Sequence, residues 1–218
     1  MRNISPSVLS ADFSKLKDQL DVVKSAGATR IHLDVMDGNF VPNLTFGPII
    51  IKAIKELTNL HLETHLMINN PYKYINEYIS AGSDTLIFHY EASDNIERDL
   101  NKIKDRKVKC GLAIKPETNY VVLEKYLHLL DYILIMSVSP GFGGQGFIKE
   151  TLLKMESINK MCIKNNCRNK IKLGVDGGVN LNTIKKIYET GIDITIVGSA
   201  LYGAENVENR FKQLMNAK

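Results

Sequence analysis

The sequence predicts a closed (β/α)8 barrel that occupies residues 1–218 as a single domain. Short apolar runs alternate with amphipathic stretches along the whole chain and give eight strand–helix units. A length of 218 residues suits one such barrel. The open doubly wound sheet is the competing α/β architecture, but no G-x-G-x-x-G motif follows the first predicted strand.

The predicted strands are short runs that are apolar on both faces, as parallel strands covered by helices should be. We expect them over residues 4–10, 31–37, 60–68, 85–89, 108–114, 132–138, 171–175 and 192–197. The predicted helices carry apolar residues at helical spacing, as Leu16, Leu20 and Val23 do in the first of them. We expect helices over residues 14–26, 48–57, 71–80, 96–105, 121–127, 147–164, 181–189 and 207–215.

Composition and charge exclude several function classes. The chain is 44% hydrophobic and 24% charged, which is ordinary globular usage, and its net charge of +4 is too small to indicate a nucleic acid or a membrane as a partner. No apolar run reaches the roughly 18 residues of a membrane span, and the N-terminus has no signal-peptide pattern. Cys110, Cys162 and Cys167 form no CxxC pair, which favours free thiols in a reducing compartment. We therefore expect a cytoplasmic protein.

Four polar residues interrupt the apolar strands. His32 and Asp34 share one face of the second strand, because side chains at i and i+2 point the same way. His65 lies on the third strand and Asp176 at the end of the seventh, and barrel chemistry sits at the C-terminal strand ends. One His–Asp pair alone would be read as a polar layer of the core, but four such residues need mutual satisfaction. A divalent cation would satisfy them all, and these donors suit zinc, iron(II), manganese or cobalt.

Three methionines lie beside these residues. Met36 and Met67 continue the same strand faces toward the mouth of the barrel, and Met136 lies near the end of the sixth strand. Two interpretations stay open for them. They fill the core, as methionine commonly does, or they form an apolar collar that excludes water from the reacting carbon.

Glycine-rich loops follow the last three strands, where barrels often hold phosphate near a short extra helix. Glycine lets the backbone approach an anion closely. The candidate residues are Gly141, Phe142, Gly143 and Gly144 after the sixth strand, Gly177 and Gly178 after the seventh, and Gly198 and Ser199 after the eighth. Residues 199–202 are the candidate short helix. Ser7 offers a hydroxyl either to the substrate or to a structural hydrogen bond, Asp37 suits a turn, and His89 receives no role.

At ten short motifs the chain resembles the family of D-ribulose-5-phosphate 3-epimerases, nearly from end to end. The motifs are SPS at 5–7, LSAD at 9–12, HLDVMDG at 32–38, FVPN at 40–43, FGP at 46–48, HLM at 65–67, LAIKP at 112–116, PGFGGQ at 140–145, DGG at 176–178 and GSA at 198–200. Two loop positions depart from the family pattern. Asn39 stands where a His is common, and Glu117 stands where a Gly is common.

The resemblance implies a barrel of the ribulose-phosphate-binding type, with one divalent metal per subunit held by His32, Asp34, His65 and Asp176. It implies that Asp34 and Asp176 are the two acid/base groups of a C3 epimerisation between ribulose 5-phosphate and xylulose 5-phosphate. It also implies phosphate contacts from the three glycine loops and substrate contacts from Ser7 and His65. Family members commonly form dimers or larger assemblies, so we expect a homo-oligomer.

Other functions are considered beside this one. A related phosphate-binding barrel would epimerise a hexulose 6-phosphate or decarboxylate a sugar phosphate. Decarboxylases of this group use a D-x-K-x-x-D arrangement, whereas the second strand here reads His-x-Asp-x-Met-Asp and carries no inward Lys. A catalytically inactive barrel that acts as a sensor or scaffold is the non-enzymatic alternative, and the complete set of site residues argues against it.

Overall fold

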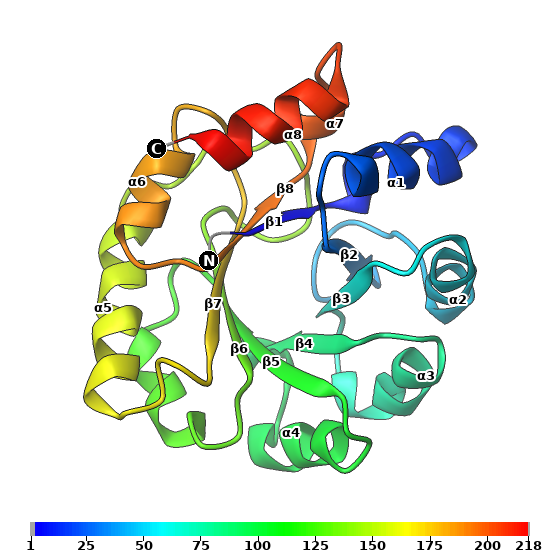
Figure 1. The fold of residues 1–218 in the computed structure, drawn as a ribbon. Helices are drawn as coiled ribbons and strands as arrows, with labels where there is room; N and C mark the ends of the chain where they lie inside the picture. Colours follow the sequence, from blue (N-terminus) through cyan, green and yellow to red (C-terminus); the bar gives the residue numbers. More distant parts are fainter. Residues whose placement is uncertain (1–2, 218) are drawn as a thin grey trace.

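The computed structural model describes residues 3–217 and contains one eight-stranded parallel sheet, in the order β1-β8-β7-β6-β5-β4-β3-β2. The strands are β1 (Asn3–Pro6), β2 (Arg30–Met36), β3 (His61–Met67), β4 (Thr85–His89), β5 (Lys109–Ile114), β6 (Tyr132–Met136), β7 (Lys172–Asp176) and β8 (Ile194–Val197). They curve into a nearly closed ring with the helices outside (Figure 1). The predicted (β/α)8 barrel is confirmed.

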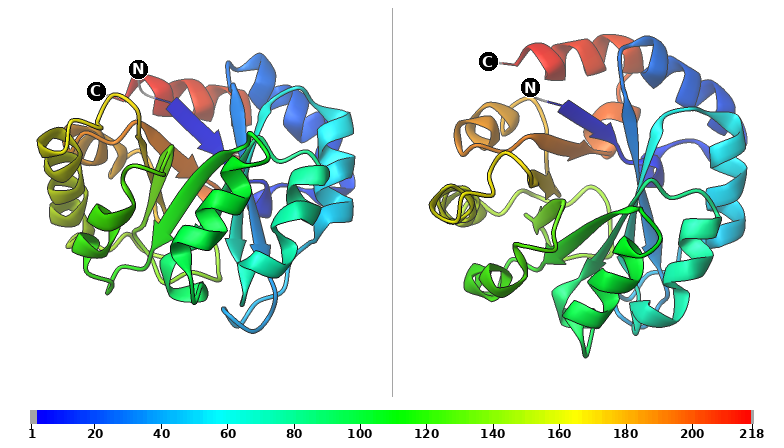
Figure 2. Two further views of the ribbon diagram at one scale, coloured as in Figure 1. Left: turned by 90° about the horizontal axis from the view of Figure 1, so that it is seen from below. Right: turned by 60° about the horizontal axis from the view of Figure 1, so that its bottom comes forward.

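Helices follow the strands and cover the outside of the barrel, as both views of Figure 2 show. The α-helices are α1 (Leu16–Ser25), α2 (Pro48–Leu57), α3 (Ile75–Ser80), α4 (Ile96–Lys104), α5 (Thr151–Lys164), α6 (Ile184–Glu189), α7 (Ser199–Tyr202) and α8 (Val207–Asn216). The 3-10 helices are η1 (Val8–Ser10), η2 (Phe13–Lys15), η3 (Pro71–Tyr74), η4 (Tyr90–Ala92) and η5 (Tyr120–Tyr126). The expected short helix after the eighth strand is therefore present as α7.

Several predicted boundaries or types are wrong. The helices predicted over 71–80 and 181–189 begin later, as α3 at Ile75 and α6 at Ile184, and three further differences have a local cause. The segment predicted as a helix over 121–127 is the 3-10 helix η5, which buries only Leu123 and so has too little apolar contact to hold a regular α-helix. The helix predicted from residue 147 begins at Thr151, because the backbone N–H of Ile148 donates to the carbonyl of Ser137 just after β6. The first strand ends at Pro6, after which the chain makes the tight turn η1.

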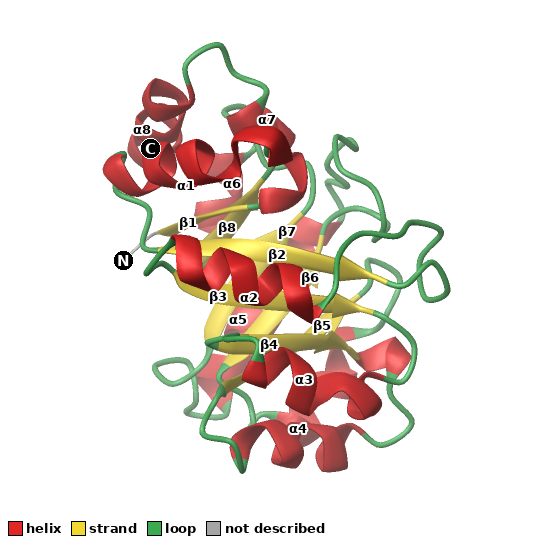
Figure 3. Cartoon of the chain, turned by 90° about the vertical axis from the view of Figure 1, so that its right-hand side faces the viewer, coloured by secondary structure: helices red, strands yellow, loops and turns green. Residues whose placement is uncertain are grey.

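The barrel closes between β1 and β2 through a single parallel bridge that joins Ser7 to His32. The other neighbouring strands pair through regular parallel ladders. The register of β2 with β3 places Asp34 beside His65. In Figure 3 the arrowheads of β2 and β3 point toward the same end of the barrel. The site residues near the ends of these strands therefore meet at one mouth.

Within residues 3–217 the buried apolar residues form three clusters, and the smallest of them contains Met36, Val41 and Met67. The largest cluster lies between the strands and the helices, and a smaller one fills the barrel interior with Ile87, Ala113, Leu134 and their neighbours. Tyr132 belongs to the interior cluster and occupies space that Gly174 leaves free, since a Cβ on Gly174 would lie 2.1 Å from the Tyr132 hydroxyl. The floor of the barrel is thus packed, and the open space is at the mouth.

The three cysteines are free, as the sequence predicted. Cys110 is buried on β5, and burial raises the pKa of its thiol to about 12, so it is a packing residue and not a nucleophile. None of the helices within residues 3–217 has the length and apolarity that a membrane crossing needs.

Candidate active site

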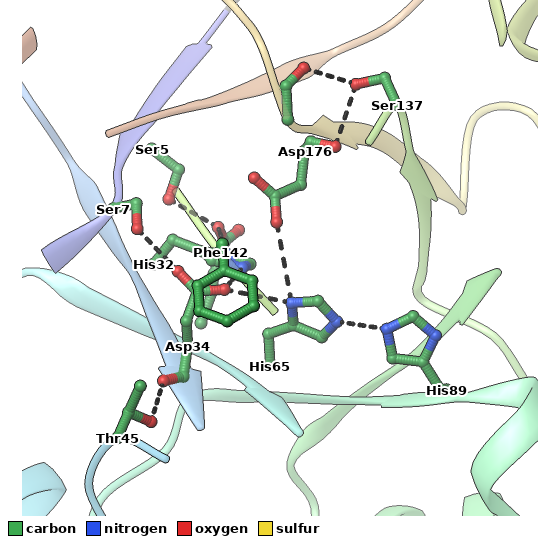
Figure 4. Close-up of polar contacts among 12 residues, drawn as sticks. Ser5, Ser7, His32, Asp34, Thr45, His65, His89, Ser137, Phe142 and Asp176 are labelled. Carbon is green, nitrogen blue, oxygen red and sulfur yellow. Dashed lines mark hydrogen bonds and ion pairs between the residues drawn. The ribbon is translucent and has the colours of Figure 1, made fainter. Parts of the chain in front are cut away.

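Four side chains from three strands converge at the mouth of the barrel (Figure 4). His32 and Asp34 lie two residues apart on β2, His65 lies on β3, and Asp176 is the last residue of β7. Each offers one nitrogen or oxygen, and these four atoms all lie within 4.8 Å of one another. The structure thus brings together the residues that strand alternation singled out.

The cluster is almost completely removed from solvent. His32 and His65 are fully buried, Asp34 is 4% exposed, and the side chain of Asp176 is 17% exposed. The Oδ1 atom of Asp34 lies 3.4 Å from Nε2 of His32 and 3.3 Å from Nδ1 of His65. The same Nδ1 lies 3.9 Å from Oδ2 of Asp176. These separations leave room for a small cation between the donors.

The ring nitrogens of His32 give independent support for a divalent metal at this cluster. Neither ring nitrogen of His32 has a hydrogen-bond partner among residues 3–217, although both are buried. A buried polar atom without a partner is costly, and metal coordination is one way to satisfy it. Two imidazoles with two carboxylates match the ligand preferences of zinc and its transition-metal neighbours.

Charges within the cluster move the two carboxyl groups in opposite directions. Burial raises the pKa of Asp34, but the neighbouring His32 and His65 outweigh it and hold this pKa well below its usual range. Burial and the charge of Asp34 raise the pKa of Asp176 to about 7. One carboxylate is therefore held ionised while the other is able to carry a proton near neutral pH, which is the division of roles that acid/base catalysis needs.

The two imidazoles also differ. Burial acts to lower the pKa of His32, but the Asp34 carboxylate overcomes it and raises this pKa to about 10. Burial together with the neighbouring imidazoles lowers the pKa of His65 to about 3. His65 is thus a neutral ring with a lone pair available on one nitrogen.

A cavity joins this cluster to the glycine loops. It is lined by all of the remaining candidates, namely Ser7, Met36, Met67, Met136, Gly141, Phe142, Gly143, Gly144, Gly177, Gly178, Gly198 and Ser199. The three methionines are all buried, and Met36 packs with Met67 and Val41 in one small cluster. They fill the core and border the cavity at once, so both interpretations of them fit the same geometry.

The loop after β7 has no room for side chains. Gly177 and Gly178 have φ angles of +115° and +64°, which only glycine adopts readily. A Cβ on Gly178 would lie 2.5 Å from the backbone nitrogen of Phe147. On the other side of the cavity α7 begins at Ser199 directly after β8. The backbone is therefore exposed to the cavity where the sequence predicts a phosphate.

Two residues outside the cluster, Asp37 and Ser7, make hydrogen bonds that the sequence suggested. Asp37 accepts hydrogen bonds from the backbone nitrogens of Asn39, Phe40 and Asn69, which confirms its turn-forming role. Ser7 donates a hydrogen bond to Asp34 and also lines the cavity.

Three functional candidates were missed from the sequence. His89 contacts Nε2 of His65 at 3.0 Å, and Glu91 contacts the other nitrogen of His89, also at 3.0 Å. Glu63 is fully buried beneath His32, with its Oε2 atom 3.8 Å from Nδ1 of that ring. The available signal was spacing, since Glu63 precedes His65 by two residues on one face of β3 and His89 follows the inward Ile87 by two on β4.

Comparison with known proteins shows the family of the chain. Residues 3–202 match the model of the Ribulose-phosphate 3 epimerase family. The chain belongs to this family. The ribulose-phosphate 3-epimerase of Bacillus subtilis is 39% identical over 218 residues, which cover 100% of both chains. The one from Synechocystis is 42% identical over 217 residues, covering 99% of this chain and 94% of that relative. The family resemblance seen in the motifs is confirmed, and the chain is an epimerase.

Solved structures agree with the architecture. The KGPDC of Streptococcus mutans has a TM-score of 0.71 at 13% identity and covers 100% of this chain and 97% of its own. A 3-hexulose-6-phosphate synthase has a TM-score of 0.67 at 15% identity, covering 100% and 99%. At such identities the likeness bears on the barrel fold alone, and the epimerase family stands on the sequence relatives.

Proposed function

We propose that this epimerase interconverts D-ribulose 5-phosphate and D-xylulose 5-phosphate by proton transfer at C3 between two carboxyl groups. The observation that carries the proposal is the pairing of Asp34 with Asp176, whose pKa values are shifted in opposite directions within one buried cluster. The pentulose phosphate comes from the names of the relatives in the family.

Asp34 is ionised and takes the C3 hydrogen as a proton from one face of the substrate. The electron pair of the broken C–H bond moves toward the C2 carbonyl and leaves an enediolate. Asp176 is protonated and delivers its proton to C3 from the opposite face, after which the carbonyl re-forms. In the reverse direction the two residues exchange roles, and general acid/base catalysis of this kind typically contributes about 10²–10⁴-fold.

Two protein groups prepare Asp34 for this role. Ser7 donates a hydrogen bond of 2.7 Å to its Oδ2 atom, and Thr45 donates one of 2.7 Å to its backbone carbonyl. A hydrogen bond to the charged form of a carboxylate favours ionisation and fixes its orientation. Asp34 therefore starts as the base, with Oδ2 held by Ser7 and Oδ1 directed toward the two imidazoles.

His32, Asp34, His65 and Asp176 are the residues that would hold the divalent metal. A bound cation of zinc, iron(II), manganese or cobalt supplies Lewis-acid stabilisation of the negative charge on the substrate oxygens. The buried methionines Met36, Met67 and Met136 border the cavity and exclude water, which strengthens the electrostatic interactions inside it. The loops around Gly143, Gly178 and Ser199 would bind the phosphate through backbone N–H groups.

The test follows the C3 hydrogen. The protein is incubated with D-ribulose 5-phosphate in heavy water, and we expect deuterium at C3 of both epimers, seen by NMR. Complete metal removal with a chelator should stop the exchange, and addition of Zn²⁺, Fe²⁺, Mn²⁺ or Co²⁺ should restore it. Exchange that continues unchanged without metal would contradict the metal requirement, and no exchange in the metal-loaded protein would contradict the activity.

A further inference from the structure

A chain of polar side chains leads from the metal cluster to the loop after β5. Its first member is His65, whose Nδ1 atom faces Asp34 while Nε2 points away from the cluster. Nε2 lies 3.0 Å from Nε2 of His89, and Nδ1 of His89 lies 3.0 Å from Oε2 of Glu91. Figure 4 shows the imidazoles of His65 and His89 end to end. One imidazole, that of His89, thus separates the Glu91 carboxylate from the cluster.

Glu91 is fixed at the outer end of this chain. Its Oε1 atom accepts hydrogen bonds from the backbone nitrogen of Lys115, at 2.9 Å, and from the hydroxyl of Thr118. Lys154 of α5 donates to the carbonyl oxygens of Lys115 at 3.0 Å and of Thr118 at 2.6 Å, and so ties down the same loop. Because Oε1 is occupied by two donors, Oε2 is the oxygen left for His89.

One arrangement of protons satisfies both links between His65 and Glu91. A carboxylate only accepts hydrogen bonds, so Nδ1 of His89 must carry its hydrogen toward Glu91. The neutral ring then has a lone pair on Nε2, which accepts a hydrogen bond from Nε2–H of His65. The neutral His65 is left with a lone pair on Nδ1, 3.3 Å from Oδ1 of Asp34 and 3.9 Å from Oδ2 of Asp176. These atoms are all acceptors, and a cation held among them would satisfy them together, whereas the cluster that could hold a metal does not include Glu91.

The opposite arrangement fails at its outer end. If His65 carried its hydrogen on Nδ1, His89 would have to donate from Nε2, and its Nδ1 lone pair would face the Glu91 carboxylate at 3.0 Å. Two acceptors in contact in a buried place are strongly unfavourable. His89 is fully buried, and the ring of Phe40 covers it with centroids 4.9 Å apart, which hinders relief by water.

We propose that Glu91 and His89 are positioning residues which hold His65 in the tautomer that presents the Nδ1 lone pair to a metal ion. Histidine ligands commonly donate their second N–H to a carboxylate, which fixes the ring and raises its basicity, and loss of such a partner typically weakens metal binding about 10–100-fold. Here a second imidazole is inserted between the ligand and its carboxylate. The inference rests on the proposed metal site and adds the device that orients one of its ligands.

Two measurements on the whole protein test this relay of Glu91, His89 and His65. The first is Zn²⁺ affinity, obtained by competition with a chromogenic chelator. We expect His89→Leu and Glu91→Leu to weaken Zn²⁺ binding about 10–100-fold. His89→Gln, whose amide oxygen is able to accept from His65, should recover part of the affinity. The matched control is His61→Leu, since His61 lies at the other end of β3 and bonds to Thr85.

The second measurement reads the tautomer directly. In ¹⁵N NMR of the wild-type protein, His65 should carry its hydrogen on Nε2, with or without Zn²⁺, and His89 should carry its own on Nδ1. A His65 protonated on Nδ1, or Zn²⁺ affinity that is equal in His89→Leu, His89→Gln and wild type, would overturn the relay. Should a leucine variant fail to fold, as judged by circular dichroism, Glu91→Gln and His89→Gln carry the test.

The two proposals fail in different ways. If the wild-type protein bound neither Zn²⁺ nor Co²⁺, the proposed metal site would be wrong, while the His65 tautomer would still decide the relay. If wild type bound the metal tightly and the relay variants bound it equally well, the metal site would stand and the relay would be rejected.

Discussion

The hydroxyl of Ser7 donates a hydrogen bond of 2.7 Å to the Oδ2 atom of Asp34. Ser7 also forms the bridge to His32 that closes the barrel between β1 and β2. Closure of the barrel and orientation of the proposed base therefore depend on the same turn. The sequence left a choice between a substrate contact and a structural hydrogen bond for Ser7. The structure shows the hydrogen bond and also places Ser7 on the wall of the cavity, so the substrate contact stays a prediction.

Ser7→Ala should lower kcat about 10- to 100-fold with a smaller effect on KM. A hydrogen bond to a charged group contributes about 1.5–3 kcal/mol, and its loss both raises the pKa of Asp34 and frees its orientation. Steady-state kinetics with D-ribulose 5-phosphate measures the change. Ser157→Ala on α5 is the control, because the one hydrogen bond of its hydroxyl within residues 3–217 goes to the carbonyl of Leu153. A kcat within twofold of wild type would show that this bond is unimportant.

Asp34→Asn and Asp176→Asn should each remove turnover without unfolding the chain. An amide has almost the same shape as the carboxyl group but is a poor acid and a poor base, so each variant lacks one of the two proton-transfer steps. We expect kcat to fall by at least about 10²-fold in each, measured by coupled assay and by C3 deuterium exchange. Asp21→Asn on the exposed face of α1 serves as a control. Full activity in either active-site variant contradicts the two-base mechanism.

The features of the fold and the site that the sequence predicts are those set by residues close together along the chain. The strands and most helices were predicted because apolar periodicity is a local property, and His32, Asp34 and His65 were found because neighbours on one strand face share a spacing of two. The type of η5 was missed because it is set by how little of that segment the barrel buries.

The sequence could not predict which side chains form hydrogen bonds across the barrel interior. Glu63 on β3 accepts a hydrogen bond from Ser5 on β1 at 2.7 Å, although β1 and β3 are not neighbours in the sheet, and this pair meets only because the sheet curves into a barrel. His89 was given no role for the same reason. Its spacing marks it as inward-facing, but only the assembled barrel shows that its two nitrogens meet His65 and Glu91.

Gly178→Ala should destabilise the protein by about 2–5 kcal/mol. The new Cβ has to adopt a left-handed backbone conformation, which costs roughly 1–2 kcal/mol, and it also meets the Phe147 backbone at 2.5 Å, where overpacking costs about 1–3 kcal/mol more. Gly144→Ala is the matched control, since Gly144 has a φ of +75° but, apart from its chain neighbours, no atom of residues 3–217 lies within 4 Å of its added Cβ. Urea unfolding of both variants measures the difference, and equal losses would show that contact with Phe147 does not matter.

The pH dependence of stability should reveal the fixed carboxylate of Glu91. Burial raises the pKa of this group, but bonds from His89, Thr118 and the Lys115 backbone outweigh it and lower the pKa from its usual 4.5 to about 2. A lowered pKa means that Glu91 stabilises the fold fully above pH 4.5 and loses this contribution as the pH falls toward 2. The shift corresponds to about 3 kcal/mol.

Glu91→Gln removes the titration and leaves a side chain of the same shape. We therefore expect wild type to exceed the variant in free energy of unfolding by about 3 kcal/mol at most near pH 7, and the gap to narrow by about 1.4 kcal/mol per pH unit below 4.5. Urea unfolding of the metal-free proteins at a series of pH values measures the gap, and metal-free samples separate this effect from loss of metal in acid. A gap that stays constant from pH 6 to pH 3 would mean that Glu91 is not held as an ionised anchor, and the outer end of the His89 relay would then lack its fixed acceptor.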